Sequence, residues 1–331
     1  MTIVSLSLEG KSMTTLSDVA KKANVSKMTV SRVINHPEKV TNELKELVFK
    51  AMKDLDYKPN VAAKALANNR TQVVKFFILE EIDTTEPYYM NLLMGISKEL
   101  DKHQYSLQLV TENSFDLGQS DGYIITGMRE EHNDWVERLE KPFVLFGENR
   151  YGYDFVDTDN TLGTEMATEH AIKQGYEKIV YVGIDVKEPF EFSREAGYIN
   201  TMQRYKKVPE IVRFENRSRY SNRFIDEQFA RYPKNTAFVC SSDRLAIGVE
   251  RGLQKHEANI PKDYGVIGFD GVFLDQIAYP RLTTIKQSVV EMGASCATML
   301  LNKINQKGAP QGNQLFEPKL IVRGSTKLKE E

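Results

Sequence analysis

A short stretch near the N-terminus concentrates side chains that can read nucleic acid. Lys27, Met28, Thr29, Ser31 and Arg32 follow one another closely. Basic side chains can donate hydrogen bonds to guanine or phosphate, hydroxyls can bond either, and a methionine can contact a thymine methyl group. If one helix carries these residues, its N-terminal end can present them to the major groove of DNA. The stretch therefore predicts a recognition helix.

Two short helices joined by a tight turn are expected to position that stretch. Asn24 can adopt left-handed backbone geometry in the turn, and Ser26 is placed to cap the second helix. The spacing of apolar residues supports both helices, because it repeats along one helix face. These residues are Leu16, Val19, Ala20 and Ala23 in the first helix and Val30, Val33 and Ile34 in the second. The arrangement is a helix-turn-helix.

A third helix and a short linker segment follow. Thr41 is a plausible N-cap for a helix that buries apolar residues at helical spacing from Leu44 to Leu55. Pro59 disfavours helix at the residue before it. The Ala-rich segment 60–69 is shorter than the ~12–15 residues that an isolated helix needs in water. We therefore expect this segment to be helical only when something stabilises it.

Three motifs resemble the headpiece of the LacI/GalR transcriptional regulators. They are Leu16-Ser-Asp-Val-Ala, Val25-Ser-x-x-Thr29-Val-Ser-Arg-Val33 and Tyr57-x-Pro-Asn60. The resemblance implies a hinge helix at 60–69 that orders on DNA, pairs with its dimer mate and wedges Leu66 into the minor groove. The implied DNA-binding residues are Thr15, Leu16, Ser26, Lys27, Met28, Thr29, Ser31, Arg32, Asn35, Thr41, Tyr57, Asn60, Ala63 and Leu66. The alternatives are a helical bundle that binds no DNA and an ordinary linker helix.

Charge is distributed unevenly along the 331 residues. Residues 13–70 hold 11 Lys and Arg against 6 Asp and Glu, whereas residues 71–331 hold 32 against 39. A basic module on an acidic body suits a DNA-binding domain attached to a sensor. Cys240 and Cys296 have apolar neighbours and are expected to be reduced core residues of a cytoplasmic protein. The sequence shows neither a membrane-spanning stretch nor a signal peptide.

The rest of the chain alternates strand and helix patterns from Gln72 onward, and the series restarts near Asp159. This pattern predicts two doubly wound lobes with parallel sheets covered by helices. The expected fold class is α + α/β. The expected domains are an extension without a role at 1–12, the headpiece at 13–59, the hinge at 60–71 and a two-lobed effector-binding and dimerisation domain at 72–331.

This body resembles the periplasmic-binding-protein-like effector domain of the same family. The landmarks are Gly175-Tyr-x-Lys-Ile179, Ser193-Arg-x-x-Gly197, Ser242-Asp-x-x-Ala246-x-Gly248, Gly268-Phe-Asp270, Pro280-x-Leu-Thr-Thr-Ile-x-Gln287 and Leu320-Ile-Val-Arg-Gly-Ser-Thr326. One departure concerns the first lobe. The family places a helix between its second and third strands, but residues 111–121 leave too little room for one. We expect that lobe to lack a helix and to offer one sheet face to a partner.

Residues that directly follow strands are the candidates for binding a small-molecule effector. In open α/β sheets ligands bind at the carboxyl ends of strands, which in a two-lobed protein face the crevice between the lobes. Arginine can donate a fork of hydrogen bonds, carboxylates can accept from hydroxyls, and an aromatic ring can pack on a sugar face. The candidates are Tyr88, Tyr89, Asp159, Arg194, Tyr220, Asp243 and Asp270. Alternatively, Arg194 and Asp270 form a mere salt bridge, and Tyr220 is simply exposed.

Catalysis and metal binding find little support in the sequence. The five histidines are scattered without metal-ligand spacing, and no nucleophile elbow or phosphate-binding loop is present. No cofactor is expected, and an enzyme fused to a DNA-binding domain is a remote alternative. The favoured hypothesis is a homodimeric repressor that binds palindromic operator DNA and is released by a sugar or sugar phosphate. Corepression and control by a protein partner are the alternatives.

Overall fold

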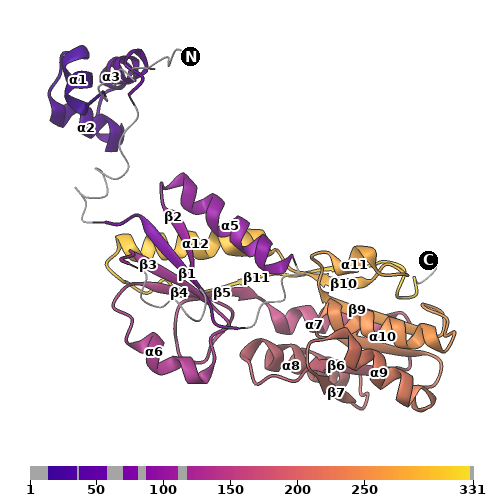
Figure 1. Ribbon diagram of the computed structural model, residues 1–331. Coiled ribbons are helices and arrows are strands. Elements are labelled where there is room, and N and C mark those ends of the chain that lie inside the picture. The colour runs from indigo at the N-terminus through magenta and orange to yellow at the C-terminus, as the bar shows by residue number, and fades with distance from the viewer. Residues whose placement is uncertain (1–13, 36, 58–69, 81–86, 111–117, 329–331) are drawn as a thin grey trace, which may run out of the picture. The chain divides into compact units, whose positions relative to one another are not determined.

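The computed structural model describes residues 14–35, 37–57, 70–80, 87–110 and 118–328 (Figure 1). The chain divides into two compact units, Met1–Thr71 and Gln72–Glu331. Each unit is described by itself. The expected extension at 1–12 and the hinge residues Asn60, Ala63 and Leu66 lie outside the described residues.

The first unit contains a helix-turn-helix and a third helix. Its elements are α1 (Leu16–Lys22), α2 (Lys27–Asn35), the 3-10 helix η1 (Pro37–Lys39) and α3 (Asn42–Asp54). Asn24 has a φ of 52°, so the turn between α1 and α2 uses the left-handed geometry predicted for it. Apolar residues of all three helices form one core, which includes Val19, Val30 and Val48. The predicted three-helix arrangement is confirmed.

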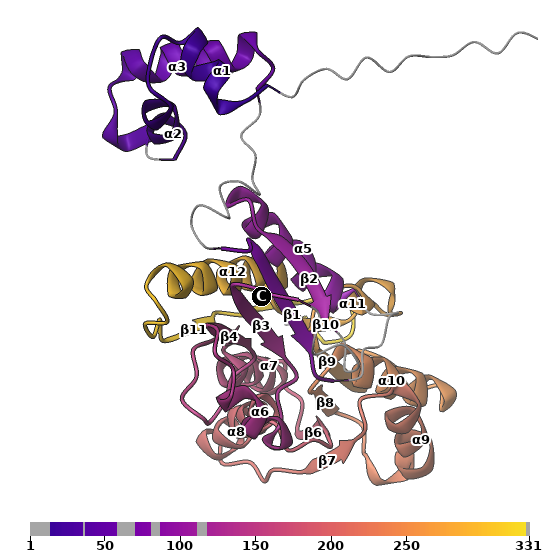
Figure 2. The same ribbon diagram turned by 60° about the vertical axis from the view of Figure 1, so that its left-hand side comes forward.

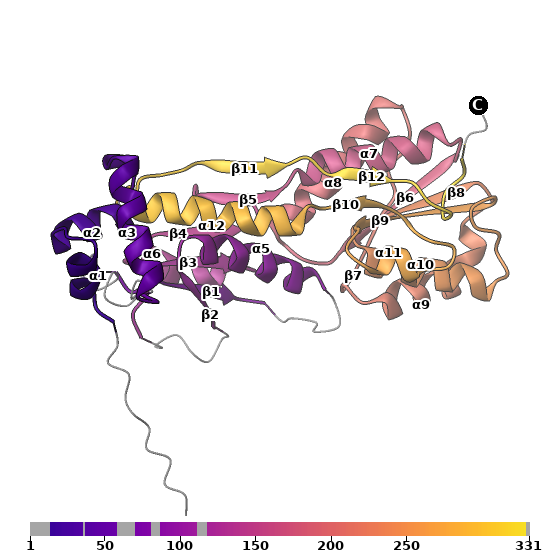
Figure 3. The ribbon, with the colours of Figure 1, turned by 90° about the horizontal axis from the view of Figure 1, so that it is seen from above.

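The first lobe of the second unit is built on a six-stranded parallel sheet. Its order is β11-β5-β4-β3-β1-β2. The strands are β1 (Val73–Ile78), β2 (Ser106–Val110), β3 (Gly122–Thr126), β4 (Phe143–Phe146), β5 (Phe155–Thr158) and β11 (Asn313–Phe316). Helices α5 (Tyr88–Lys102) and α12 (Val289–Asn305) pack together over one face, as Figures 1 and 3 show.

The opposite face of this sheet has a lighter cover. It carries the 3-10 helix η2 (Glu130–His132) and the five-residue helix α6 (Asn133–Glu137). The Trp135 ring packs edge-on against Phe77, with ring centroids 5.1 Å apart. Between β2 and β3 the described residues 118–121 contain no helix, and 111–117 lie outside the described part of the chain. The expectation that a helix is missing here is therefore tested only over residues 118–121.

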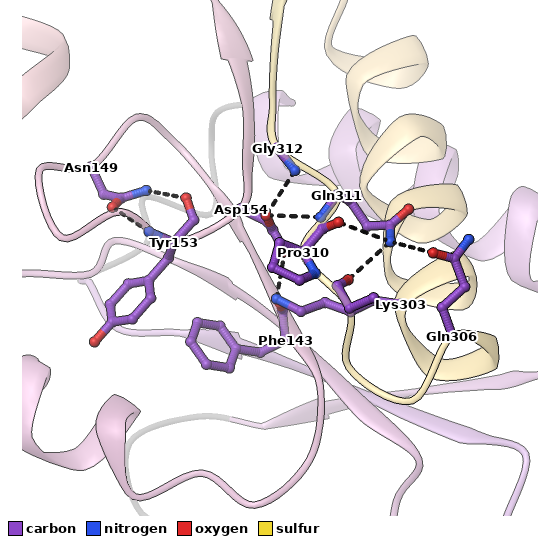
Figure 4. A network of polar contacts seen from close by, with 10 residues as sticks. Phe143, Asn149, Tyr153, Asp154, Lys303, Gln306, Pro310, Gln311 and Gly312 are labelled. Atoms are coloured by element: carbon purple, nitrogen blue, oxygen red, sulfur yellow. Dashed lines mark hydrogen bonds and ion pairs between the residues drawn. The ribbon is translucent and has the colours of Figure 1, made fainter.

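A buried ion pair fastens the C-terminal part of the chain to this first lobe (Figure 4). Lys303 at the end of α12 donates to Asp154 Oδ2 at 2.5 Å and to the Phe143 carbonyl oxygen at 3.1 Å. The other Asp154 oxygen accepts from the backbone N–H groups of Gln311 (3.0 Å) and Gly312 (2.8 Å). Burial opposes ionisation of Asp154, but these hydrogen bonds outweigh it and hold its pKa below the usual value. The turn that leads into β11 is thereby fixed.

The second lobe repeats the architecture with a sheet of order β12-β10-β9-β8-β6-β7 (Figure 2). Only β12 runs antiparallel, against β10. The strands are β6 (Lys178–Ile184), β7 (Ile211–Phe214), β8 (Thr236–Cys240), β9 (Tyr264–Asp270), β10 (Thr283–Lys286) and β12 (Lys319–Ile321).

Helices cover both faces of the second sheet. Apolar side chains of α7 (Asn160–Lys173) and α8 (Pro189–Arg204) pack on one face. Those of α9 (Ser218–Gln228) and α10 (Asp243–Lys255) pack on the other. The short elements η3 (Phe229–Arg231) and α11 (Leu274–Ile277) complete the lobe. The predicted doubly wound lobes are confirmed.

The chain crosses between the two lobes three times. The crossings run from β5 to α7, from β10 to α12 and from β11 to β12. The first crossing passes through Asp159, where the sequence pattern predicts a restart. Cys240 and Cys296 are buried free thiols, as predicted. Among the described residues no helix is long and apolar enough to cross a membrane.

Candidate DNA-reading helix and inter-lobe site

The N-terminal end of α2 presents uncommitted side chains to solvent. Met28 is 70% exposed, and Lys27 and Arg32 are exposed as well. The Ser26 hydroxyl oxygen accepts a hydrogen bond from the Thr29 N–H at 3.0 Å, so it caps the helix as predicted. The first turn of α2 contains no acidic residue. The helix end therefore keeps its favourable interaction with phosphate.

The other predicted DNA-binding residues of the first unit have mixed surroundings. Thr15 and Asp18 form a capping box at the start of α1, and Thr41 accepts a hydrogen bond from the Leu44 N–H at 3.4 Å. Leu16 and Tyr57 are half-buried against the headpiece core. Ser31 is half-buried in α2, and Asn35 is the last residue of that helix. Their contacts with DNA remain predictions.

In the second unit, Arg194 is the centre of the predicted effector site. It lies in α8 and is 6% exposed. Its Nε donates to Asn160 Oδ1 at 2.8 Å, and its Nη1 donates to the Ser241 carbonyl oxygen at 2.6 Å. The guanidinium carbon stands 3.7 Å from the centroid of the Phe269 ring. Arg194 is thus held at the carboxyl ends of β8 and β9, and its hydrogen bonds go elsewhere than to Asp270.

Three buried or half-buried carboxyl groups share the charge of Arg194. Burial raises the pKa of Asp157 to about 6 and that of Glu191 to about 7, and it also raises the pKa of Glu148. In each case the positive charge of Arg194 opposes the rise. Asp157 Oδ2 accepts from the Glu148 N–H at 2.9 Å and from Asn160 Nδ2 at 3.2 Å. Acidic groups of both lobes therefore surround one guanidinium group.

Gln287, which sequence reasoning named only as part of a family landmark, connects the two lobes. Its Oε1 accepts from the Thr158 hydroxyl at 2.7 Å and from the Tyr88 hydroxyl at 3.5 Å. Its Nε2 donates to Asp270 Oδ1 at 2.9 Å. Thr158 and Tyr88 belong to the first lobe, and Asp270 ends β9 of the second. One buried amide therefore joins two predicted effector residues across the crossover.

Two predicted carboxylates have structural duties. Asp243 is 1% exposed and accepts from the Gly271 N–H at 2.9 Å and from the Thr284 hydroxyl at 2.5 Å. It therefore fixes the turn after β9, which corrects its expected place among effector contacts. Asp159 Oδ1 caps α7 by accepting from the Leu162 N–H at 2.9 Å.

The two predicted tyrosine contacts at the start of α5 are both partly buried. Tyr88 and Tyr89 pack edge-on, and the Tyr89 hydroxyl donates to Glu80. Tyr220 lies elsewhere, in α9, where its hydroxyl accepts from Arg219 at 2.9 Å. The structure brings Tyr88, Arg194 and Asp270 into one polar arrangement and leaves Tyr220 to a surface pair. We call the first arrangement, with Asp157, Asn160 and Gln287, the inter-lobe site.

Two contacts join the lobes beside this site. Arg129, which follows β3, donates through Nε to Glu188 at the start of α8 at 3.2 Å. Arg150, which follows β4, stands 4.8 Å from the ring centroid of Phe192 in α8. Among the described residues, no group of three or more His, Cys, Asp and Glu side chains could hold a metal ion.

Comparisons with known proteins agree with both parts of the chain. Residues 15–60 match the bacterial regulatory proteins of the lacI family, and residues 168–326 match the periplasmic binding protein-like domain. The chain is 58% identical over 317 residues to the uncharacterized HTH-type transcriptional regulator YvdE of Bacillus subtilis strain 168, covering 95% of this chain and 100% of that one.

Two solved structures show the same fold. A complex of the transcriptional regulator CelR with cellobiose has a TM-score of 0.71 and 24% identity, covering 94% of this chain and 99% of that one. A lac repressor dimer bound to operator and an anti-inducer has a TM-score of 0.69 and 22% identity, covering 95% and 99%. The family consists of transcription regulators rather than enzymes. With its helix-turn-helix headpiece and two parallel α/β lobes, the chain belongs to the LacI family of bacterial transcriptional regulators.

Proposed function

We propose that the chain is a repressor of carbohydrate-utilisation genes that a sugar or sugar-derived effector releases from a palindromic operator. The observation that carries this proposal is the inter-lobe site, where Gln287 joins Tyr88 and Thr158 of one lobe to Asp270 of the other. A ligand bound there contacts both lobes. It can therefore bind one lobe arrangement better than another and shift the equilibrium between them.

The proposed ligand contacts are Arg194, Asp270, Tyr88 and Gln287. Arg194 and Asp270 supply a donor and an acceptor for hydroxyl groups, and the Tyr88 ring supplies an apolar surface. Tyr89 and Asp159 border these residues, whereas Tyr220 remains a weaker candidate. CelR, which shares this fold, is known in complex with cellobiose, and this supports a sugar as the class of ligand.

On the DNA side, we assign base reading to α2. Lys27 can donate to the O6 and N7 atoms of guanine, and Met28 can contact a thymine methyl group. A homodimer would place two such helices on half-sites about one helical turn apart, roughly 34 Å. The hinge residues 60–69 would order on that DNA. A regulator of this kind acts in the cytoplasm, where the chromosome is.

A second copy of the chain is the proposed partner for an exposed apolar surface of the second unit. Met90 and Met94 of α5 are 60% and 44% exposed, and Ile277 of α11 is 60% exposed. Both helices lie on the upper side of this unit in Figure 1. The lac repressor with the same fold is a dimer on its operator. Sedimentation of Met94→Glu, with the exposed Glu140→Gln as control, tests this: a dimer should dissociate only in the first variant.

Corepression and control by a protein partner are the alternative mechanisms. The light cover on one face of the first sheet favours a partner, since Leu109 of the edge strand β2 is 46% exposed. The deciding experiment selects an operator from random duplexes and titrates the complex with sugars at fixed salt. Release by a sugar supports induction, and tighter binding shows corepression. An unchanged complex that a second protein from the same cell dissociates shows control by a partner.

A further inference from the structure

We propose that the inter-lobe site takes an uncharged, polyhydroxylated sugar and rejects sugar phosphates. This inference rests on the proposed function, because it narrows the class of effector at the same site. It follows from the charges that surround Arg194, from the engagement of the nearby guanidinium groups and from the first turns of the surrounding helices.

The first observation is an excess of carboxyl groups around Arg194. Glu148, Asp157 and Glu191 each interact with its charge. Burial raises the pKa of all three, which shows that one guanidinium group does not compensate them fully. Adding a phosphate group would bring further negative charge into the same surroundings, and like charges placed together oppose binding.

The second observation is that the guanidinium groups at the site are already engaged. Arg194 spends Nε and Nη1 on Asn160 and Ser241, and Phe269 covers one face of its guanidinium group. Arg129 pairs with Glu188, and Arg150 stacks on Phe192. Arg244 in the first turn of α10 also has an interaction partner. A phosphate would have to displace these contacts, whereas a hydroxyl group needs only one donor or acceptor.

The third observation concerns the helix N-termini of the second lobe, which commonly bind phosphate. The first turn or N-cap of each helix that begins near the site already carries a carboxylate. Asp159 caps α7, Glu188 and Glu191 stand at the start of α8, and Asp243 stands at the start of α10. These acids neutralise the positive ends of the helix dipoles. The helices therefore offer little attraction to an anion.

The same groups suit sugar hydroxyls. Glu148 Oε1 is buried and accepts no hydrogen bond from the described residues, so it lacks a donor. A hydroxyl group can supply that donor without adding charge. Asp270 and Gln287 present further carboxylate and amide atoms. The site therefore offers mainly acceptors, which a neutral sugar can satisfy with its hydroxyl protons.

The test compares each sugar with its own phosphate ester. The full-length protein on its selected operator is titrated with ribose and ribose 5-phosphate, glucose and glucose 6-phosphate, and cellobiose and its 6′-phosphate. We expect the active sugar to release the operator at a concentration about 100-fold lower than its ester. Equal or better release by an ester overturns this inference and leaves the proposed function standing. Operator binding without release by any of the six compounds removes the sugar response and this inference together.

A charge variant tests the cause of the discrimination. Glu148→Gln removes one carboxylate of the site, and we expect the preference for the neutral sugar over its ester to narrow by about tenfold. Glu140→Gln is the matched control, because Glu140 is exposed after α6 and should leave the preference unchanged. If Glu148→Gln binds the sugar but keeps the full preference, the carboxylates do not cause the rejection and the inference fails.

Discussion

The outer surface of α2 and the inter-lobe site solve recognition in opposite ways. On α2, Lys27, Met28 and Arg32 are exposed, and the charge of the surrounding segment is positive. In the inter-lobe site, Arg194, Asp157 and Glu191 are buried, and acidic groups prevail. The first surface can meet a large, hydrated polyanion without rearranging its own contacts. The second site exchanges internal hydrogen bonds for those of a small ligand.

This difference teaches where regulation can originate. Exposed side chains on one helix change little between states of the protein, so they set which DNA is bound. Buried groups from two lobes depend on how the lobes are arranged, so ligand binding there is coupled to that arrangement. Substitutions at the two places should therefore change different properties.

The largest effect is expected for Arg194→Ala. The substitution leaves Asn160 and the Ser241 carbonyl without their donor and removes the only charge that the three carboxyl groups are shown to share. Loss of one partner from a buried charged network costs about 2–5 kcal/mol, so the effector concentration for half-release should rise on the order of 100-fold or more. Fluorescence anisotropy of labelled operator measures this. Operator affinity without effector should stay unchanged, and a normal response to effector would remove Arg194 from the site.

A pH effect separates the buried site from the exposed helix through Glu191→Gln. The folded pKa of Glu191 is about 7 instead of 4.5, because burial disfavours its charge. A raised carboxyl pKa stabilises the fold at low pH, and this contribution is lost as the pH rises from about 4.5 to 7. The loss is on the order of 3 kcal/mol. The glutamine variant does not titrate.

We therefore expect the melting temperature of Glu191→Gln, relative to the unsubstituted protein, to rise steadily between pH 5 and pH 8. Calorimetry in buffers of equal ionic strength measures it. Glu140→Gln should show a constant difference, since Glu140 is exposed. A difference for Glu191→Gln that is independent of pH would contradict the assignment of a buried, mostly protonated carboxyl group.

Lys27→Ala should act on DNA sequence preference alone. Loss of a contact to guanine costs about 1–3 kcal/mol of discrimination, which is roughly 10-fold to 100-fold at one position of each half-site. Selection of operators from random duplexes shows the position. Lys50→Ala on α3 removes the same charge from another exposed residue and should keep the preference. An unchanged preference in Lys27→Ala at every position would move base reading away from this residue.

The smallest effect is expected for Ser26→Ala, which removes the cap of α2. Such caps contribute about 1 kcal/mol, so amide hydrogen exchange in the first turn of α2 should accelerate roughly fivefold. Thr41→Ala at α3 is the comparison. Its hydrogen bond is longer, 3.4 Å against 3.0 Å, and the effect should be smaller. Equal exchange in Ser26→Ala and the unsubstituted protein would show that the cap does not hold the helix.

The headpiece could be predicted from the sequence because its contacts are local. The turn at Asn24 and the caps at Ser26 and Thr41 involve neighbours within three or four residues, and each was expected from residue type. The helical spacing of Val30 and Val33 likewise gave the core. A short motif is enough when the interactions that decide the structure lie inside it.

The inter-lobe site could be predicted only in part. Arg194 and Asp270 follow strands and were expected there, but Gln287 bonds Thr158 across 129 residues of sequence. No local pattern announces such a pair. Asp243 also follows a strand, yet its carboxylate turns to Gly271 and Thr284. Position after a strand shows that a residue lies near the site, while the direction of its hydrogen bonds depends on the packed fold.

The measurement that tests the account most directly is a titration of the selected operator complex with neutral sugars at one fixed salt concentration. The account predicts that one sugar releases the operator from the unsubstituted protein and that Arg194→Ala binds the same operator but keeps it. If that sugar releases both proteins equally, or if every sugar leaves the unsubstituted complex intact, the inter-lobe site is not the sensor and the central claim is wrong.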